Sequence, residues 1–208
     1  NFHTAPTCSP TRAMLLSGVD SHLAGLGNMA ELLAPNQQGK PGYEGYLNFR
    51  VVSAASLLRD TGYRTYMAGK WHLGKTKETG PSARGFDKSF ALLEGGGSHF
   101  NHAGLIENSQ AHYRENGNEV ELPDNFYSSD FYTDRIIDNI ESGRDKSEPF
   151  FAYLAYTAPH WPLQAPDKYL QKYAGRYDDG YEVLQKKRLM NAVSKGVIPE
   201  GVQPTPLI

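Results

Sequence analysis

The run Thr-Cys-Ser-Pro-Thr-Arg at the start of the chain combines residues that could act together on an anionic group. It contains Cys8, the only cysteine among the 208 residues. Pro10 suits the first turn of a helix, and Ser9 could cap that helix, so Cys8 would lie just before its N-terminus. Arg12, four residues after Cys8, would reach back toward the thiol over one helical turn. A thiol, a cation and free backbone N–H groups predict an oxyanion site. A buried apolar cysteine beside a surface arginine is the alternative.

A second group of polar residues follows a predicted strand at 63–68, which is rich in aromatic and β-branched residues. Lys70 and His72 are two positions apart, so in extended backbone both side chains point the same way and Trp71 points into the packing. This arrangement would place a cation and a base at the carboxyl end of the strand. A solvated lysine and a histidine bonded to the backbone are the alternative interpretation.

A third group follows the apolar run 149–156, which is typical of a fully covered central strand. His160 comes directly after this run. The carboxyl ends of parallel strands form the ligand-binding edge of open α/β sheets. The sequence therefore predicts that His72 and His160 lie at the same edge of one sheet.

The three groups, taken together, resemble the signatures of the formylglycine-dependent (type I) sulfatases. The residues at 8–12 resemble the Cys-x-Pro-x-Arg signature, with Ser-Gly at 17–18 where the family usually has Thr-Gly. The strings at 69–74 and 158–162 resemble the second signature and the segment with another active-site histidine. Segments 39–45 and 84–87 are similar to bacterial arylsulfatases, so the likeness covers nearly the whole chain.

The resemblance implies an α/β fold of the alkaline-phosphatase-like sulfatase type, layered, with a mostly parallel central sheet flanked by helices. We expect the fold to be incomplete, with residues 1–208 forming a partial sulfatase catalytic domain and the chain being an internal fragment. The parts expected to be missing at both ends would carry the other calcium ligands. The Asp-Asn dipeptide at 124–125 comes too early in the order to match them, and the Asp-Asp pair at 178–179 lies in a loop of the wrong context.

The resemblance also implies a chemistry for each matching residue. Cys8 would be converted by a formylglycine-generating enzyme to formylglycine, whose hydrate binds calcium and attacks the sulfur of a small-molecule sulfate ester. A covalent sulfated intermediate would then release sulfate, after the alcohol or phenol has left. Arg12 and Lys70 would orient the modified residue, His72 would be the base for collapse of the intermediate, and His160 would protonate the leaving group. Aryl sulfates are the expected substrates, although this fragment alone is expected to be inactive.

Two other functions remain open. The same nucleophile could serve a formylglycine-dependent phosphonate monoester or phosphodiester hydrolase. A non-catalytic sulfatase-fold module is less favoured, because loss of catalysis would usually spoil Cys8, Arg12, Lys70 or His72, and all four are intact.

Composition limits the possible partners. The chain is 39% hydrophobic with a formal net charge of −2, so no basic field favours nucleic acid. It has no run of eighteen apolar residues that would favour a membrane, and the compartment, bacterial cytoplasm or periplasm, stays open. His99, His102 and His112 lack the carboxylate or thiolate spacing of a zinc site.

Periodicity predicts the remaining elements. Helices are expected over 51–61, 128–142 and 182–195, with short helices near 29–33 and after 166. The segment 75–123 is polar and rich in glycine, and no strand is predicted there. Gly95, Gly96 and Gly97 are expected to form a flexible turn.

Overall fold

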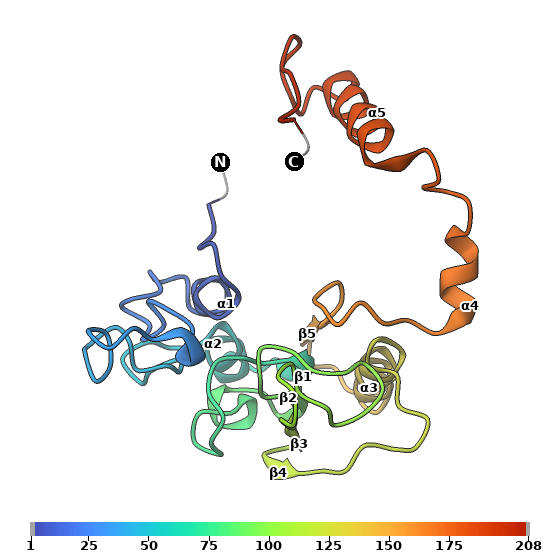
Figure 1. Cartoon of the computed structure of the whole chain (residues 1–208). Coiled ribbons are helices and arrows are strands. Elements are labelled where there is room, and N and C mark those ends of the chain that lie inside the picture. Colours follow the sequence, from blue (N-terminus) through green and yellow to red (C-terminus); the bar gives the residue numbers. More distant parts are fainter. Residues whose placement is uncertain (1–2, 207–208) are drawn as a thin grey trace. The chain divides into compact units, whose positions relative to one another are not determined.

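The computed structural model describes residues 3–206, and the chain separates into two compact units, the first ending at Gln164 and the second beginning at Ala165. Figure 1 labels their helices and strands. The first unit contains α1 (Cys8–Ser17), η1 (Ala30–Leu32), α2 (Ala54–Asp60), β1 (Arg64–Lys70), η2 (Pro81–Arg84), β2 (Lys88–Leu92), β3 (Tyr113–Glu115), β4 (Asn118–Glu119), α3 (Ser128–Glu141) and β5 (Phe150–Ala155). The second contains α4 (Asp167–Leu170), η3 (Gln171–Tyr173) and α5 (Gly180–Ser194).

The first unit is built on a mixed sheet with the strand order β4-β3-β2-β1-β5. β1 pairs in parallel with both β2 and β5, while β3 and β4 extend the sheet in antiparallel fashion beyond β2. The predicted layered α/β fold is confirmed. Its parallel part is the three strands whose carboxyl ends meet at one edge, and a hairpin extends it on one side.

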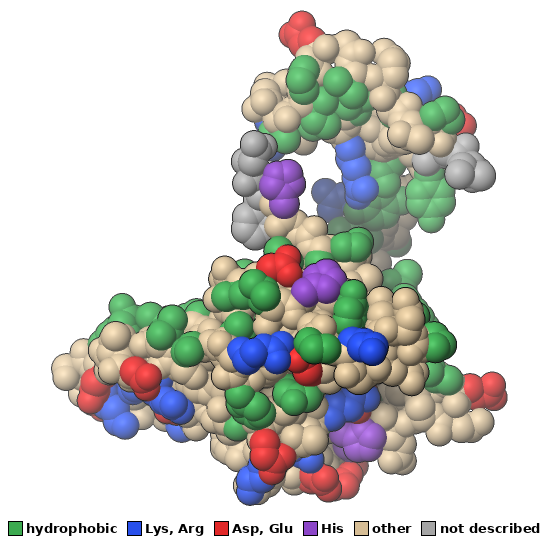
Figure 2. Space-filling view, turned by 90° about the vertical axis from the view of Figure 1, so that its left-hand side faces the viewer, with side chains coloured by type: hydrophobic (Ala, Val, Ile, Leu, Met, Phe, Trp, Pro, Cys, Tyr) green, Lys and Arg blue, Asp and Glu red, His purple; other side chains and the backbone are tan. Residues whose placement is uncertain are grey.

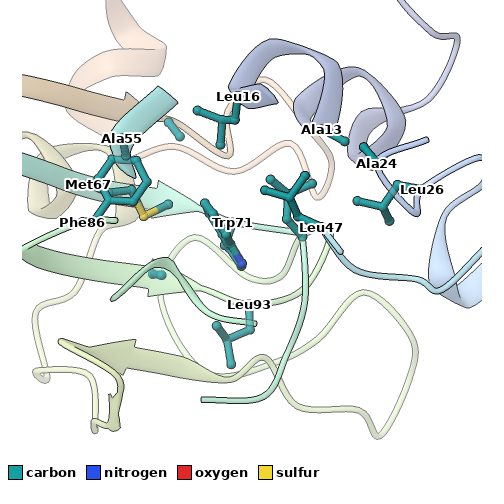
Figure 3. Packing of buried hydrophobic residues seen from close by; sticks show 13 residues of the cluster. Ala13, Leu16, Ala24, Leu26, Leu47, Ala55, Met67, Trp71, Phe86 and Leu93 are labelled. Atoms are coloured by element: carbon teal, nitrogen blue, oxygen red, sulfur yellow. The ribbon is translucent and has the colours of Figure 1, made fainter. Parts of the chain in front are cut away.

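Helices cover both faces of the sheet, as the alternation of side chains along β1 requires. Met67 packs into a cluster with Ala13 and Leu16 of α1 and Ala55 of α2. Figure 3 shows that cluster, with Trp71 in its middle. Aromatic and aliphatic residues of α3 cover the opposite face, in a second cluster that contains Tyr66, Ala68, Phe90, Tyr132 and Ile136. The sheet therefore lies between two hydrophobic clusters.

The segment 75–123 does not lack strands, and the prediction for it is wrong. It contains β2, β3 and β4 as well as η2. β3 and β4 are joined by Asn116 and Gly117, which have φ values of 50° and 83°. Asn-Gly with both residues at positive φ is the preferred two-residue hairpin turn, because its twist matches that of the strands. The Asn-Gly dipeptide could have predicted the hairpin, but it lies in a glycine-rich segment that was interpreted as lacking strands.

β5 was predicted as a fully covered central strand, and its position is different. It lies at one end of the described sheet and pairs with β1 alone, and Phe150 at its start is 45% exposed. Its two faces are only partly buried, with Phe151 and Tyr153 packed on one cluster and Ala152 and Leu154 on the other, so the strand is not fully covered. Partial burial of both faces explains the near-continuous apolar run. An apolar run predicts that the faces of a strand are buried, but it does not predict whether the strand has a neighbouring strand on both sides.

The predicted helices are present with shifted starts. α2 begins at Ala54 rather than at 51, because the side chain of Ser53 caps it by accepting a hydrogen bond from the Ser56 N–H at 3.1 Å. α3 and the 3₁₀ helix η1 lie close to the predicted ranges. In the second unit, α5 turns its half-buried positions Leu184, Leu189, Ala192 and Val193 to one side, as predicted, although none is fully buried.

The described surface carries charges of both signs. On the face that Figure 2 shows, Lys and Arg side chains lie among Asp and Glu side chains. Within residues 3–206, no helix combines the length and the apolar character needed to cross a bilayer. Whether the chain is one partial domain over 1–208 stays a prediction.

Candidate functional site

The helix at the predicted oxyanion site begins two residues earlier than expected. Thr7, in extended backbone, is the N-cap residue of α1, and its carbonyl accepts the first helical hydrogen bond, from Thr11 N–H at 3.2 Å. Cys8 is therefore the first residue of the helix and does not precede it, and Ser9 does not cap it. Pro10 lies in the first turn, as predicted, and Gly18 ends the helix in a left-handed conformation with φ 66°. The Cys8 side chain still stands at the positive end of the helix.

Three side chains surround the sulfur of Cys8. His72 Nδ1 lies 3.3 Å from Cys8 Sγ, and Met29 Sδ lies 3.4 Å from it. The charge of the nearby Lys70 ammonium group lowers the pKa of the thiol. Lys70 and His72 are only 4% and 6% exposed, so the cation and the base are both withdrawn from water.

Arg12 connects α1 to the end of β1. Its guanidinium donates to the backbone carbonyls of Lys70 and Trp71, the latter at 2.9 Å, and lies over the ring of Tyr153. Within residues 3–206, the guanidinium of Arg12 makes no hydrogen bond to Cys8, although its charge is influenced by the thiolate, and a direct role of Arg12 at Cys8 stays a prediction. Arg12 thus holds the helix N-terminus against the strand end that carries Lys70 and His72.

The backbone at the end of β1 turns sharply to present these side chains. Gly69 has φ 117°, and a Cβ atom there would lie 2.0 Å from the carbonyl oxygen of Ala155. His72 itself has φ 56°, a left-handed conformation that few non-glycine residues adopt. Trp71 points the other way, is fully buried, and donates its indole N–H to Thr79 O at 3.0 Å. The predicted division between Trp71 and its two polar neighbours is confirmed.

The glycines that follow β2 are buried and pack against the rings of His72 and His160. A Cβ atom on Gly95 would lie 2.6 Å from Cε1 of His72, and one on Gly96 would lie 3.2 Å from Nδ1 of His160. The two imidazoles therefore contact adjacent residues at one edge of the sheet, as the topology predicted. The three glycines do not form an exposed flexible turn. They are buried, and their lack of side chains leaves room for the two imidazole rings.

His160 lies near the other candidates without bonding to them. Its Nδ1 is 2.7 Å from the carbonyl oxygen of Trp161, and its ring stacks on the indole of that residue. Within residues 3–206, its ring makes no hydrogen bond to Cys8, Lys70 or His72. His99, which is buried, contacts Ser128 Oγ at 2.6 Å and the backbone oxygen of His160 at 3.4 Å. The structure thus assembles Cys8, Arg12, Lys70 and His72 as one cluster with His160 beside it.

The cluster favours the charged form of the nucleophile. Burial raises the pKa of Cys8, but the hydrogen bond with His72 and the charges of His72 and Lys70 outweigh it, so the pKa falls from 9.0 to about 6. Burial also lowers the pKa of Lys70, against the attraction of the Cys8 thiolate. For His72, burial lowers the pKa, and the hydrogen bonds with Cys8 and Glu31 raise it above its ordinary value.

Glu31 is the residue of the cluster that the sequence analysis missed. Its Oε1 atom lies 2.8 Å from Nε2 of His72. The hydrogen bond from His72 lowers the pKa of Glu31 to about 2, although partial burial opposes it. Glu31 comes from η1, which precedes His72 by about forty positions inside a long irregular segment. No spacing or motif in that segment connects the two residues, so only tertiary packing could reveal the contact.

We expect the Cys8 thiol of the unmodified chain to react as a thiolate at neutral pH. The rate of alkylation by iodoacetamide should fall as pH drops and reach half of its plateau near pH 6, because protonation of Cys8 has a pKa of about 6. The sole cysteine makes the label specific. Replacing His72 with glutamine should move the midpoint upward, and a wild-type midpoint near 9 would show that the cluster does not act on the thiol.

A methyl group at Gly95 should displace His72 and slow catalytic turnover of the full-length protein without unfolding it. Gly95→Ala places the new atom 2.6 Å from the imidazole, which lies between Cys8 and Glu31 and has little room to move. Misplacement by about 1 Å costs about 10²-fold in rate. Gly39→Ala is the control, because a Cβ there meets no atom within 4 Å. Equal turnover by Gly95→Ala and Gly39→Ala would show that a methyl group at residue 95 does not displace the ring of His72.

The described residues do not form a calcium site by themselves. Within residues 3–206, no group of three or more His, Cys, Asp or Glu side chains could hold a metal ion. Calcium requires six to eight oxygen ligands, whereas the contacts of the Cys8 sulfur are a thioether, an imidazole and an ammonium. The predicted binding of calcium by residue 8 therefore has no support in these contacts.

The comparisons with known proteins identify the family of the chain. Residues 1–197 match the family model described as Sulfatase. An uncharacterized sulfatase of Schizosaccharomyces pombe is 51% identical over 218 residues, which cover 100% of this chain and 39% of that protein. An arylsulfatase of Klebsiella aerogenes is 41% identical over 209 residues, covering 99% of this chain and 44% of that protein. The chain thus spans less than half the length of these two relatives.

A solved structure shares the fold. The crystal structure of Ps i-CgsB in complex with k-i-k-neocarrahexaose superposes with a TM-score of 0.67 and 28% sequence identity, over 81% of this chain and 38% of that one. The family match covers the segments that supply Cys8, Arg12, Lys70, His72 and His160. The chain belongs to the sulfatase family.

Proposed function

We propose that this chain forms part of a sulfuric ester hydrolase that cleaves small-molecule sulfate monoesters. The observation that carries the proposal is the Cys8 thiol at a helix N-terminus, with His72 3.3 Å away and Lys70 beside it. A sulfate monoester brings negative charge to the nucleophile. Buried cations and helix N–H groups offset that charge more strongly than they would in water.

Each residue has a role in this proposal. Lys70 and Arg12 hold negative charge at residue 8 and on the sulfuryl oxygens, and Arg12 also fixes the helix to the strand end. His72 takes a proton from the side chain of residue 8. His160 faces the substrate and gives a proton to the leaving oxygen, for which its location at Gly96 beside the cluster is suitable.

The nucleophile is proposed to be formylglycine made from Cys8 by a formylglycine-generating enzyme. The run at 8–12 has the signature for that modification, and Cys8 is half-buried at the start of α1. When formed, this residue would supply a hydroxyl group in place of the thiol. A calcium ion bound at the modified residue belongs to the same proposal, and no step above depends on it.

Aryl sulfates are the proposed substrates. The support is the likeness to an arylsulfatase of Klebsiella aerogenes, which is 41% identical over nearly the whole chain. The proposal commits to a small sulfate ester as the partner of the site and to neither nucleic acid nor membrane as a partner.

The test uses the full-length protein, purified from cells that make formylglycine. Sulfate release from an aryl sulfate should accompany loss of the thiol mass in the Cys8 peptide, as measured by mass spectrometry. Turnover of phosphonate monoesters or phosphodiesters in preference to sulfates would favour the alternative hydrolase. An unmodified thiol in every preparation and no turnover of any ester would favour a non-catalytic module.

The 208-residue chain alone is expected to have no sulfatase turnover, even with calcium added. Its described residues bring together the nucleophile, two cations and the base, but no set of oxygen ligands for a metal. Comparing the isolated chain with the full-length protein, at equal formylglycine content, measures the difference. Turnover by the isolated chain within about tenfold of the full-length rate would contradict this expectation.

A further inference from the structure

Glu31 occupies the far side of His72 from the nucleophile. The two ring nitrogens of His72 contact different partners, Nδ1 facing Cys8 Sγ at 3.3 Å and Nε2 facing Glu31 Oε1 at 2.8 Å. The imidazole is therefore held in line between a carboxylate and residue 8. The function proposed above uses His72 and residue 8 and leaves Glu31 without a role.

A neutral imidazole carries one proton, on one nitrogen or the other. A carboxylate can only accept, so its contact with Nε2 keeps the proton on that nitrogen. Nδ1 then presents its lone pair to residue 8. Without Glu31, the proton could move to Nδ1, and the ring would face residue 8 with a donor rather than an acceptor.

The segment that carries Glu31 is itself fixed at the site. Met29, directly before η1, contacts Cys8 Sγ through its sulfur at 3.4 Å. Asn28 Nδ2 donates to Leu32 O at 2.8 Å and to Gln37 Oε1 at 3.1 Å, which ties the ends of the turn together. One short segment thus reaches both the nucleophile and its base.

The ring of His72 has little freedom to adopt another orientation. Its backbone has φ 56°, its side chain is 6% exposed, and Gly95 lies against Cε1. Glu31 is 46% exposed, so the pair is open to water on the carboxylate side only. The geometry of the pair is suited to orienting a base.

We propose that Glu31 is a positioning residue that fixes the tautomer and orientation of His72 for proton transfer from residue 8. The inference deepens the function proposed above and rests on it. It assigns Glu31 to the same machinery as His72, although the two residues are forty-one positions apart.

The kinetic test compares Glu31→Ala and Glu31→Gln in the full-length protein. Removal of a residue that orients a base costs about 10–100-fold, so Glu31→Ala should lower kcat by that factor with KM within about twofold. Glu31→Gln should recover part of the loss, because its amide oxygen can still accept from Nε2. Glu94→Gln is the matched control, since Glu94 Oε1 lies 2.8 Å from Nδ1 of His112, outside the site. An equal fall of kcat in Glu31→Ala and Glu94→Gln would overturn the proposal, and so would an unchanged kcat in Glu31→Ala.

A second measurement does not depend on sulfatase activity. In a Cys8→Ala background at about pH 8, where an ordinary imidazole is neutral, ¹⁵N NMR of labelled histidines reports which nitrogen of His72 carries the proton. The proton should sit on Nε2, and Glu31→Ala should shift the population toward Nδ1. A proton on Nδ1 with Glu31 intact would refute the inference. If the full-length protein has no turnover, the proposed function fails and this measurement alone decides the role of Glu31.

Discussion

Replacing Cys8 with alanine is expected to lower kcat/KM of the full-length protein for a sulfate ester by about 10⁴-fold or more, the scale seen when a nucleophile is removed. The side chain of residue 8 contacts His72, lies near the charge of Lys70 and stands at the N-terminus of α1. Its removal leaves those groups without a reacting atom to stabilise. Because Cys8 is only half-buried, the fold should persist, and circular dichroism should be unchanged.

Met29→Leu is the matched control for that experiment. Met29 touches the same sulfur atom at 3.4 Å, but it supplies no proton or charge. An apolar replacement of similar volume costs less than about 1.5 kcal/mol in stability, and we expect turnover within a few-fold of wild type. Residual turnover by Cys8→Ala within tenfold of wild type would assign the nucleophile to another residue.

Replacing Lys70 with methionine should lower kcat by about 10²–10³-fold, the cost of removing one preorganised charge from a transition state. The same change should leave the unfolding midpoint unchanged or raise it. Lys70 is 4% exposed, and burial lowers the pKa of its ammonium group, which means that the fold disfavours the charge. Opposite effects on rate and stability would indicate that Lys70 is retained for chemistry.

Lys40→Met separates this effect from a general loss of positive charge. Lys40 is exposed and lies far along the chain from the strand that carries Lys70. Its replacement should change kcat by less than about twofold and stability by less than about 0.5 kcal/mol. Differential scanning calorimetry and steady-state kinetics on both variants provide the comparison. Destabilisation of Lys70→Met by several degrees, with turnover intact, would make Lys70 a structural residue.

The proposed calcium ion has no complete binding site among the described residues. Cys8, Arg12, Lys70 and His72 form one cluster, while within residues 3–206 no three or more His, Cys, Asp or Glu side chains are grouped so as to hold a metal ion. A hydroxyl in place of the thiol would give the cluster one hard ligand at most.

The local sequence determined the parts of this protein that depend on local physics. Apolar periodicity located α3, and Gly18 marked the end of α1, because a left-handed cap has a residue preference that a single position can reveal. The two-residue spacing of Lys70 and His72 predicted their common direction, and parallel strand order predicted that His72 and His160 share an edge. Three short strings were sufficient to identify the family.

Only the tertiary structure decided what depends on distant contacts. The start of α1 at Cys8 depends on the extended conformation of Thr7, which its neighbours in sequence do not dictate. The position of β5 depends on which edge is paired, and the role of Gly95 depends on a ring that arrives from another strand. Glu31 reaches His72 only because an irregular loop folds back onto the helix N-terminus. Such contacts follow from packing of the whole chain, and no local pattern encodes them.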